Sequence, residues 1–119
     1  MTLEELRYHR WEPLSVVLDK DLISKFVPLD GSKVPAEVYL NLECGRVVET
    51  LLSCSDSVVL AKTDLKILKD IPVGSAIDIS TKVADLRSTG GASFVTVEQE
   101  YSFSGRAVAT LTQILAIKS

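Results

Sequence analysis

The fold is decided by residues 64–117, which read DLKILKDIPVGSAIDISTKVADLRSTGGASFVTVEQEYSFSGRAVATLTQILAI. Three segments in this stretch alternate apolar and polar residues, the period-two pattern of strands that keep one face wet. Gly90-Gly91 separates two of them, and paired glycines supply the positive φ angles of a tight hairpin turn. Ser104-Gly105 separates the next two. The stretch therefore predicts an antiparallel meander whose last strand reaches Ile117.

Upstream of the meander, residues 35–54 predict one long apolar helix. Pro35 suits a first helical turn, and Glu37 suits the positive end of the helix. Apolar residues cover a wide arc at 100° per residue, and they include Leu40, Cys44, Val47, Val48, Leu51 and Leu52. A narrow polar stripe holds Tyr39, Glu43, Arg46 and Thr50, because residues three and four apart share one side. A helix this apolar must be wrapped by the sheet.

Shorter elements complete the prediction. Residues 12–19 carry a first strand, and Asp19 is typical of an N-cap for a short helix that runs to Phe26. Residues 57–68 predict another strand with an irregularity in it. We therefore expect an α+β fold in which an antiparallel sheet wraps around one long central helix. At 119 residues the chain has the size of a single domain, 1–119.

Composition narrows the classes of function. The net charge is −3 and the basic residues are scattered, so no nucleic-acid partner is expected. The first residues lack the basic and apolar regions of a signal peptide, and we expect a cytoplasmic protein with no membrane partner. Cys44 and Cys54 share the predicted helix about 15 Å apart, which is too far for a disulfide. His9 is the only histidine, so neither a metal nor a cofactor is expected.

The predicted helix cannot bury both of its sides under one sheet. Its uncovered flank and the edge of the sheet need a partner surface. A twofold-symmetric homodimer is the commonest solution among soluble oligomers. We expect a homodimer, with a tetramer as a further step.

The helix-in-sheet pattern resembles the hotdog superfamily, which includes acyl-thioester hydrolases and hydroxyacyl-thioester dehydratases. The segment Thr63 to Ser75, TDLKILKDIPVGS, resembles the strand, proline, glycine and strand of these proteins. Asn41 to Gly45, NLECG, is similar to the acid-bearing helix of several thioesterase branches, including the fluoroacetyl-coenzyme A type. The resemblance implies the hotdog fold over about residues 12–117 and an acyl-coenzyme A substrate. The dehydratase acid and base have no counterpart here, and Asp64 stands where the fluoroacetyl-coenzyme A branch has a histidine.

Two elements could supply the chemistry of a thioesterase. The first N–H groups of a helix have no intrahelical partners, so those around Val38 and Tyr39 could bind the oxyanion of the substrate. Glu43 lies one turn further along and could act as general base or nucleophile. The alternative for Glu43 is an ordinary ion pair with Arg46 on a solvated stripe.

Three other side chains are candidates with structural alternatives. Asn41 falls on the apolar arc, where an unpaired amide is costly, so it either bonds a sheet edge or a second subunit, or it orients a substrate carbonyl. Asp64 could help to activate a water molecule. The alternative is an exposed acid on a strand, because Lys62 and Lys66 flank it in the sequence. Cys44 could be a nucleophile, but a small buried apolar role explains it better.

These residues support hypotheses from different classes of protein. The first is an acyl-coenzyme A thioesterase acting on small or medium acyl thioesters at a dimer-interface site, with Glu43, Asn41 and Asp64 as catalytic residues. The second is a non-catalytic hotdog module that binds an acyl thioester or a small apolar ligand. The third is a structural dimer without chemistry.

Overall fold

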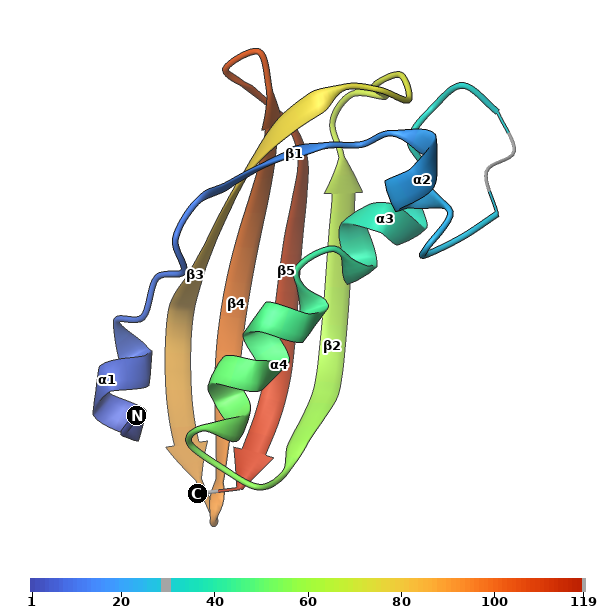
Figure 1. Ribbon diagram of the computed structural model, residues 1–119. Coiled ribbons are helices and arrows are strands. Elements are labelled where there is room, and N and C mark those ends of the chain that lie inside the picture. Colours follow the sequence, from blue (N-terminus) through green and yellow to red (C-terminus); the bar gives the residue numbers. More distant parts are fainter. Residues whose placement is uncertain (29–30, 119) are drawn as a thin grey trace.

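The computed structural model describes residues 1–28 and 31–118. Within them, five strands form one antiparallel sheet in the order β1-β3-β4-β5-β2 (Figure 1). The strands are β1 (Leu14–Val17), β2 (Val58–Ile67), β3 (Ala76–Thr89), β4 (Ala92–Phe103) and β5 (Arg106–Lys118). The predicted antiparallel meander is confirmed, since β3, β4 and β5 pair in chain order.

Two turns and one irregularity lie where the residue types predicted them, while the register shifts at Val83/Asp85 and Tyr101/Ser102 were not predicted. Gly90 and Gly91 have φ angles of 58° and 86° and join β3 to β4. The irregularity expected in residues 57–68 is a register shift between Leu60 and Lys62 of β2. The side chain of Asp19 accepts a hydrogen bond of 2.9 Å from the Leu22 N–H and caps α2 (Lys20–Ile23). This helix ends three residues before the predicted Phe26.

The predicted central helix is present in two parts, α3 (Ala36–Asn41) and α4 (Cys44–Leu52), which lie across one face of the sheet (Figure 1). The interruption at Leu42 and Glu43 has a local cause. Asn41 Nδ2 donates a 2.8 Å bond to the Glu37 carbonyl, in competition with the backbone bond of a continuous helix. The hydroxyl of Tyr101 lies 2.7 Å from the Tyr39 carbonyl, the acceptor that the Glu43 N–H would use in an unbroken helix.

Two hydrophobic clusters fill the space between the helices and the sheet. One includes Val38 and Tyr39 of α3, and the other includes Val47 and Leu51 of α4 together with Leu6 of α1 (Leu3–Arg7). The break between α3 and α4 lies at the junction of these clusters. The helices therefore cover the inner face of the sheet with two cores rather than one.

The polar stripe of the helix lies opposite to its expected place. It faces the sheet and the N-terminal arm instead of solvent. Trp11 Nε1 donates a 2.8 Å bond to Thr50 Oγ1, and Arg46 Nη1 donates a 3.0 Å bond to the Glu12 carbonyl. Tyr39 is only 1% exposed. The stripe can be buried because the arm and the sheet supply partners for its polar groups.

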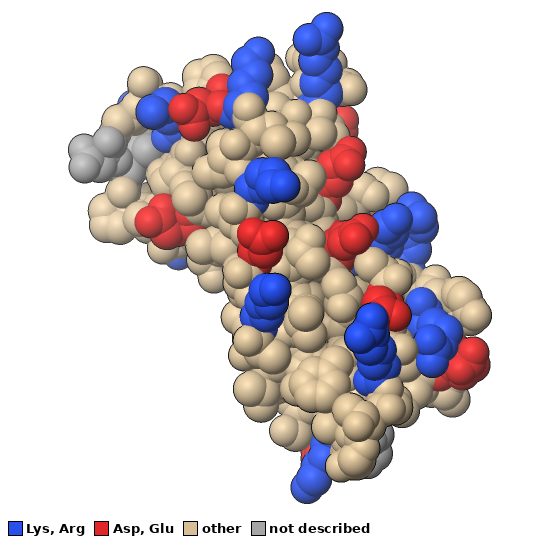
Figure 2. All heavy atoms as spheres, turned by 180° about the vertical axis from the view of Figure 1, so that it is seen from behind, with Lys and Arg blue, Asp and Glu red and all other residues tan. Residues whose placement is uncertain are grey.

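Among the described residues, no helix lies on the other face of the sheet (Figure 1). Figure 2 shows this face, on which acidic and basic side chains are interspersed with uncharged ones. In the described part of the chain, no helix has the length and apolar character needed to cross a membrane.

Candidate functional site

Four buried polar side chains lie at the level of the fold where the central helix is interrupted. Thr81, Gln99 and Gln113 lie on the inner face of β3, β4 and β5, and Glu43 lies above them at the start of α4. Their exposed fractions are 0%, 2%, 6% and 2%, respectively. Thr81 is directly opposite Gln99 in the sheet. We call these four residues the polar belt, since they separate the two hydrophobic clusters.

The Glu43 carboxylate is held by an ion pair inside the protein. Arg46 Nη2 and Nε lie 2.5 and 2.9 Å from Glu43 Oε2, and the Thr81 hydroxyl donates a 3.3 Å bond to the same oxygen. The Glu43–Arg46 pair of the sequence analysis is therefore formed, but on the buried side of the helix. A carboxylate that is almost fully buried depends on such partners, because an unpaired charge there is costly.

A tyrosine pair lies next to this carboxylate. The rings of Tyr39 and Tyr101 meet edge to face with centroids 5.0 Å apart. Tyr101 Oη lies 2.7 Å from both the Tyr39 carbonyl and Gln99 Oε1. Burial, the negative charge of Glu43 and the neighbouring Tyr39 raise the pKa of Tyr101 well above its ordinary value of 10.0. Burial and Asp70 also raise the pKa of Tyr39.

The raised tyrosine pKa values predict a loss of stability at alkaline pH. Above about pH 10 the unfolded chain releases its tyrosine protons before the folded chain does, so the free energy of unfolding falls as pH rises. Each tyrosine contributes at most about 1.4 kcal/mol per pH unit. Tyr101→Phe should make this fall shallower, and at neutral pH it should cost about 2 kcal/mol because the Tyr39 carbonyl loses its donor. Urea unfolding at a series of pH values measures both effects, and an unchanged alkaline slope in the variant would contradict the assignment.

The residues that the sequence analysis named are not brought into one site. Glu43 contacts β3 through Thr81, whereas Asp64 is in β2, three strands away and thus about 14 Å across the sheet. Asp64 is exposed and lies opposite Thr112. Asn41 is also exposed, and its partner is the Glu37 carbonyl of its own helix rather than a sheet edge.

The proposed oxyanion donors differ from expectation as well. The Val38 N–H is not free, because it bonds the Pro35 carbonyl at 3.2 Å. The side chains of Val38 and Tyr39 are 0% and 1% exposed and belong to the core. The interruption of the helix creates a second helix start at Cys44, and the Glu43 side chain does not cap it. The N–H groups in the first turn of α4 have no hydrogen-bond partner within this helix.

An apolar groove opens between α4 and the edge strand β2. Its volume is about 190 Å³. Apolar side chains form most of its lining, and Cys44 and Gln113 complete it. The apolar lining residues are Val47, Val48, Val58, Leu60 and Leu115. Cys44 is exposed, so the buried role expected for it is wrong. We call this the α4–β2 groove.

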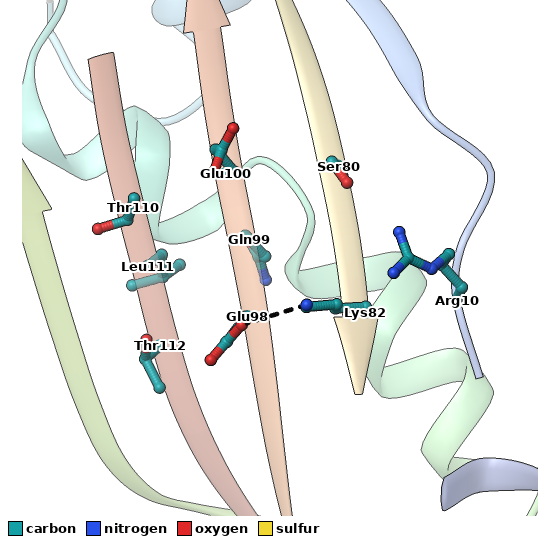
Figure 3. Close-up of a pocket in the computed structure, with 9 residues that line it drawn as sticks. All are labelled: Arg10, Ser80, Lys82, Glu98, Gln99, Glu100, Thr110, Leu111 and Thr112. Atoms are coloured by element: carbon teal, nitrogen blue, oxygen red, sulfur yellow. Dashed lines mark ion pairs between the residues drawn. The ribbon is translucent and has the colours of Figure 1, made fainter. Parts of the chain in front are cut away.

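A second groove lies on the helix-free face and has a different character. It has a volume of about 380 Å³. Figure 3 shows Lys82 and Glu98 reaching toward each other across β3 and β4, with Arg10 beyond β3. Lys82 Nζ lies 3.8 Å from Glu98 Oε2. Its lining of opposite charges and hydroxyl groups offers little contact to an acyl chain. In the described ranges, no group of three or more His, Cys, Asp or Glu side chains is placed to hold a metal.

Three residues of the belt were missed by the sequence analysis, and one of them is Thr81, which occupies an inward position of β3 between Ile79 and Val83. Gln99 and Gln113 each occupy an inward position of a strand, between Val97 and Tyr101 and between Leu111 and Leu115. The strict alternation of β4 and β5 contained this signal, because period two places residues 99 and 113 on the core face. A polar residue at such a position needs a partner or a ligand.

Comparison with known proteins agrees with this architecture. No protein-family model and no curated protein sequence matches the chain. Among solved structures, HtdX of Mycobacterium tuberculosis is similar with a TM-score of 0.73 and 13% identity over 90% of this chain. The chain spans about half of HtdX, 51% of its length.

Two further structures match over most of both chains. The 3R-hydroxyacyl-ACP dehydratase complex HadBC of Mycobacterium tuberculosis has a TM-score of 0.71 and 13% identity over 93% of this chain and 96% of its own. A Thermus thermophilus thioesterase, complexed with coenzyme A and Zn, has a TM-score of 0.66 and 16% identity over 98% and 83%. Identities this low establish a shared fold and nothing finer. With its antiparallel sheet and covering helices, the chain is a hotdog-fold protein.

Proposed function

We propose that the protein binds a short or medium acyl thioester, such as an acyl-coenzyme A, in the α4–β2 groove. The observation that carries this proposal is the apolar groove of about 190 Å³ that opens beside the uncapped start of α4. Apolar walls suit an acyl chain, and backbone N–H groups at a helix start suit a thioester carbonyl or a phosphate. Structures of the same fold that bear the names thioesterase and dehydratase support a thioester as ligand.

The groove lies next to a sheet edge that we propose to be the interface of a homodimer. β2 has ten residues and, among the strands of residues 1–28 and 31–118, pairs only with β5, so its other edge is open in this part of the chain. Val59, Leu60, Ile67 and Leu68 are 59%, 53%, 40% and 55% exposed. A long edge with exposed apolar side chains is a template for pairing with another strand. A second copy would place its own β2 beside the groove.

Hydrolysis at Glu43 is the second candidate function. Its favourable feature is that the carboxylate belongs to the residue directly before the uncapped N–H groups of α4. Its obstacle is that the carboxylate is already paired with Arg46 and hydrogen-bonded by Thr81. To act as a base, Glu43 would have to leave this ion pair. The same obstacle favours a binding module without turnover.

One experiment separates binding from hydrolysis. The purified protein is mixed with acyl-coenzyme A esters of increasing chain length, and both the melting temperature and the release of free thiol are followed. Binding at a concentration of about 100 Kd should stabilise the fold by about 2.7 kcal/mol. Continuous thiol release that disappears in Glu43→Gln would support hydrolysis. An unchanged melting temperature with every ester would refute the proposed binding.

A further inference from the structure

Cys44 is an exposed thiol on the wall of the α4–β2 groove. It is the first residue of α4, it is exposed, and it lines the α4–β2 groove together with Val47 and Val48. Its side chain thus stands at the boundary between solvent and an apolar channel. A thiolate is a strong nucleophile toward a thioester carbonyl.

Backbone groups beside Cys44 can stabilise the developing negative charge. The first turn of α4 presents N–H groups without helical partners, and no side chain caps them. A Cβ atom added at Gly45 would meet no atom within 4 Å. The space next to these amides is therefore open to a ligand. Backbone N–H groups at a helix start are suitable donors for the oxyanion of acyl transfer.

Gln113 provides an independent sign that the groove holds a polar group. Its side chain lines the groove although the residue is only 6% exposed. None of the hydrogen bonds within residues 1–28 and 31–118 involves the Gln113 side-chain amide, whose atoms are not fully enclosed; the one enclosed side-chain atom without a partner in these ranges is Gln99 Nε2. The neighbours of Gln113 along the inner face of β5, Leu111 and Leu115, are apolar. The Gln113 amide therefore faces the groove, where a ligand carbonyl would supply an acceptor for its N–H.

We propose that Cys44 accepts the acyl group of the bound thioester and becomes S-acylated. The Cys44 Sγ attacks the carbonyl carbon, a new carbon–sulfur bond forms, and the carbon–sulfur bond to coenzyme A breaks. The leaving thiolate takes up the proton that the Cys44 thiol gave up through water. One thioester is exchanged for another, so no oxidant, reductant or metal is needed. The α4 amides hold the oxyanion and Gln113 donates to the carbonyl of the acyl group.

The groove sets the chemical class of the acyl group. A volume of 190 Å³ holds about six groups the size of a water molecule. This capacity fits a short or medium chain better than a long one. The inference rests on the proposed binding of acyl thioesters, and its test must distinguish failure of acyl transfer from failure of binding.

The test follows the mass of the intact protein. The full chain is incubated with butanoyl-, hexanoyl- and hexadecanoyl-coenzyme A, and the product is treated with neutral hydroxylamine. We expect the mass to rise by one acyl group with the two shorter esters and to return after hydroxylamine. Cys44→Ser should abolish the adduct. Cys54→Ser is the matched control, because Cys54 lies beyond the other end of the helix and outside the groove, and the adduct should persist in it.

Gln113→Leu separates a binding role from a structural one. It should slow acylation about tenfold, the effect expected for loss of one hydrogen bond in the transition state. The same variant should melt at a higher temperature than the original chain, since leucine matches the apolar lining of the groove. A merely structural Gln113 would not combine slower acylation with a more stable fold.

The outcomes are distinguishable. Thermal stabilisation by the esters without an adduct, or an adduct on Cys54, overturns the inference while the proposed binding stands. Continuous thiol release that persists in Cys44→Ser without an adduct in the original chain also overturns it. One equivalent of adduct confined to Cys44 supports the inference, even where no turnover follows.

Discussion

Replacing Arg46 by methionine is expected to lower the free energy of unfolding by about 3 kcal/mol. The substitution keeps most of the apolar stem and removes the guanidinium, which leaves the Glu43 carboxylate buried beside only the Thr81 hydroxyl. Removing one partner of a buried ion pair lowers the free energy of unfolding by about 3–5 kcal/mol. The lower end applies here, because the Arg46 side chain is 30% exposed and water can reach part of the site. Urea unfolding followed by fluorescence of Trp11, the only tryptophan, measures the loss.

The matched controls isolate the uncompensated charge as the cause. Glu43→Gln removes the charge and keeps the shape, so it should cost less than Arg46→Met. The combination of both substitutions should recover much of the stability that Arg46→Met loses, because no buried charge remains. If the combined variant is as unstable as the sum of the single variants, the ion pair is not the source of the effect. Recovery would also show that the polar belt tolerates a neutral group.

Placing lysines on the open edge of β2 is expected to dissociate the proposed homodimer. Val59→Lys combined with Ile67→Lys introduces two charges into each strand, at positions that are 59% and 40% exposed in the single chain. In a dimer joined along β2 these charges would be desolvated, at several kcal/mol for each ion after relaxation. The dissociation constant should rise about a hundredfold or more, which corresponds to about 2.7 kcal/mol. Sedimentation velocity over a range of concentrations gives the constant directly.

The opposite edge of the same sheet provides the control. Leu14 and Val17 are 36% and 52% exposed and belong to β1, which has four residues and pairs with β3. Lysines at these two positions add the same charge to the chain and should leave the dimer intact. Equal dissociation by both pairs of lysines would point to a general effect of charge and away from β2. A monomeric original chain would remove the proposed interface altogether.

The dimer prediction also bears on the groove. Leu60 lines the α4–β2 groove and belongs to the same edge strand as Val59. If the second copy completes the groove, the lysine variant should lose acyl-thioester binding together with the dimer. If one chain suffices, binding should survive dissociation. Ligand-induced thermal stabilisation of the two lysine variants decides between these cases.

Local chemistry made the sheet predictable. The alternation in residues 76–117 sets which side chains face the core, and Gly90-Gly91 sets the position of a turn. Both signals act between near neighbours in the chain, so they survive in the sequence without knowledge of the rest of the fold. The Asp19 cap is predictable for the same reason, since its bond to the Leu22 N–H spans three residues.

The candidate site was less predictable. Glu43 was recognised as special, but the direction of its stripe was not, because a helical pattern gives two faces without saying what covers each. Trp11, Glu12 and Thr81 cover the polar stripe from distant parts of the chain. Asn41 was assigned to an apolar arc that was expected to be buried, but this side of the helix is partly exposed, as Leu52 at 51% shows, and the Asn41 amide bonds the Glu37 carbonyl of its own helix.

The sequence by itself determined the antiparallel meander, the helix above it and the hotdog fold that they form, because periodicity and turn residues act over short distances. Only the tertiary structure decided that this helix is interrupted at Leu42 and Glu43. The reason is that the carbonyl of Tyr39 finds the hydroxyl of Tyr101, 62 positions away in the chain. Bonds of this kind form only after the sheet and the helix have packed together. The interruption that accompanies this bond lies at the level of the polar belt, and the exposed Cys44 follows it directly.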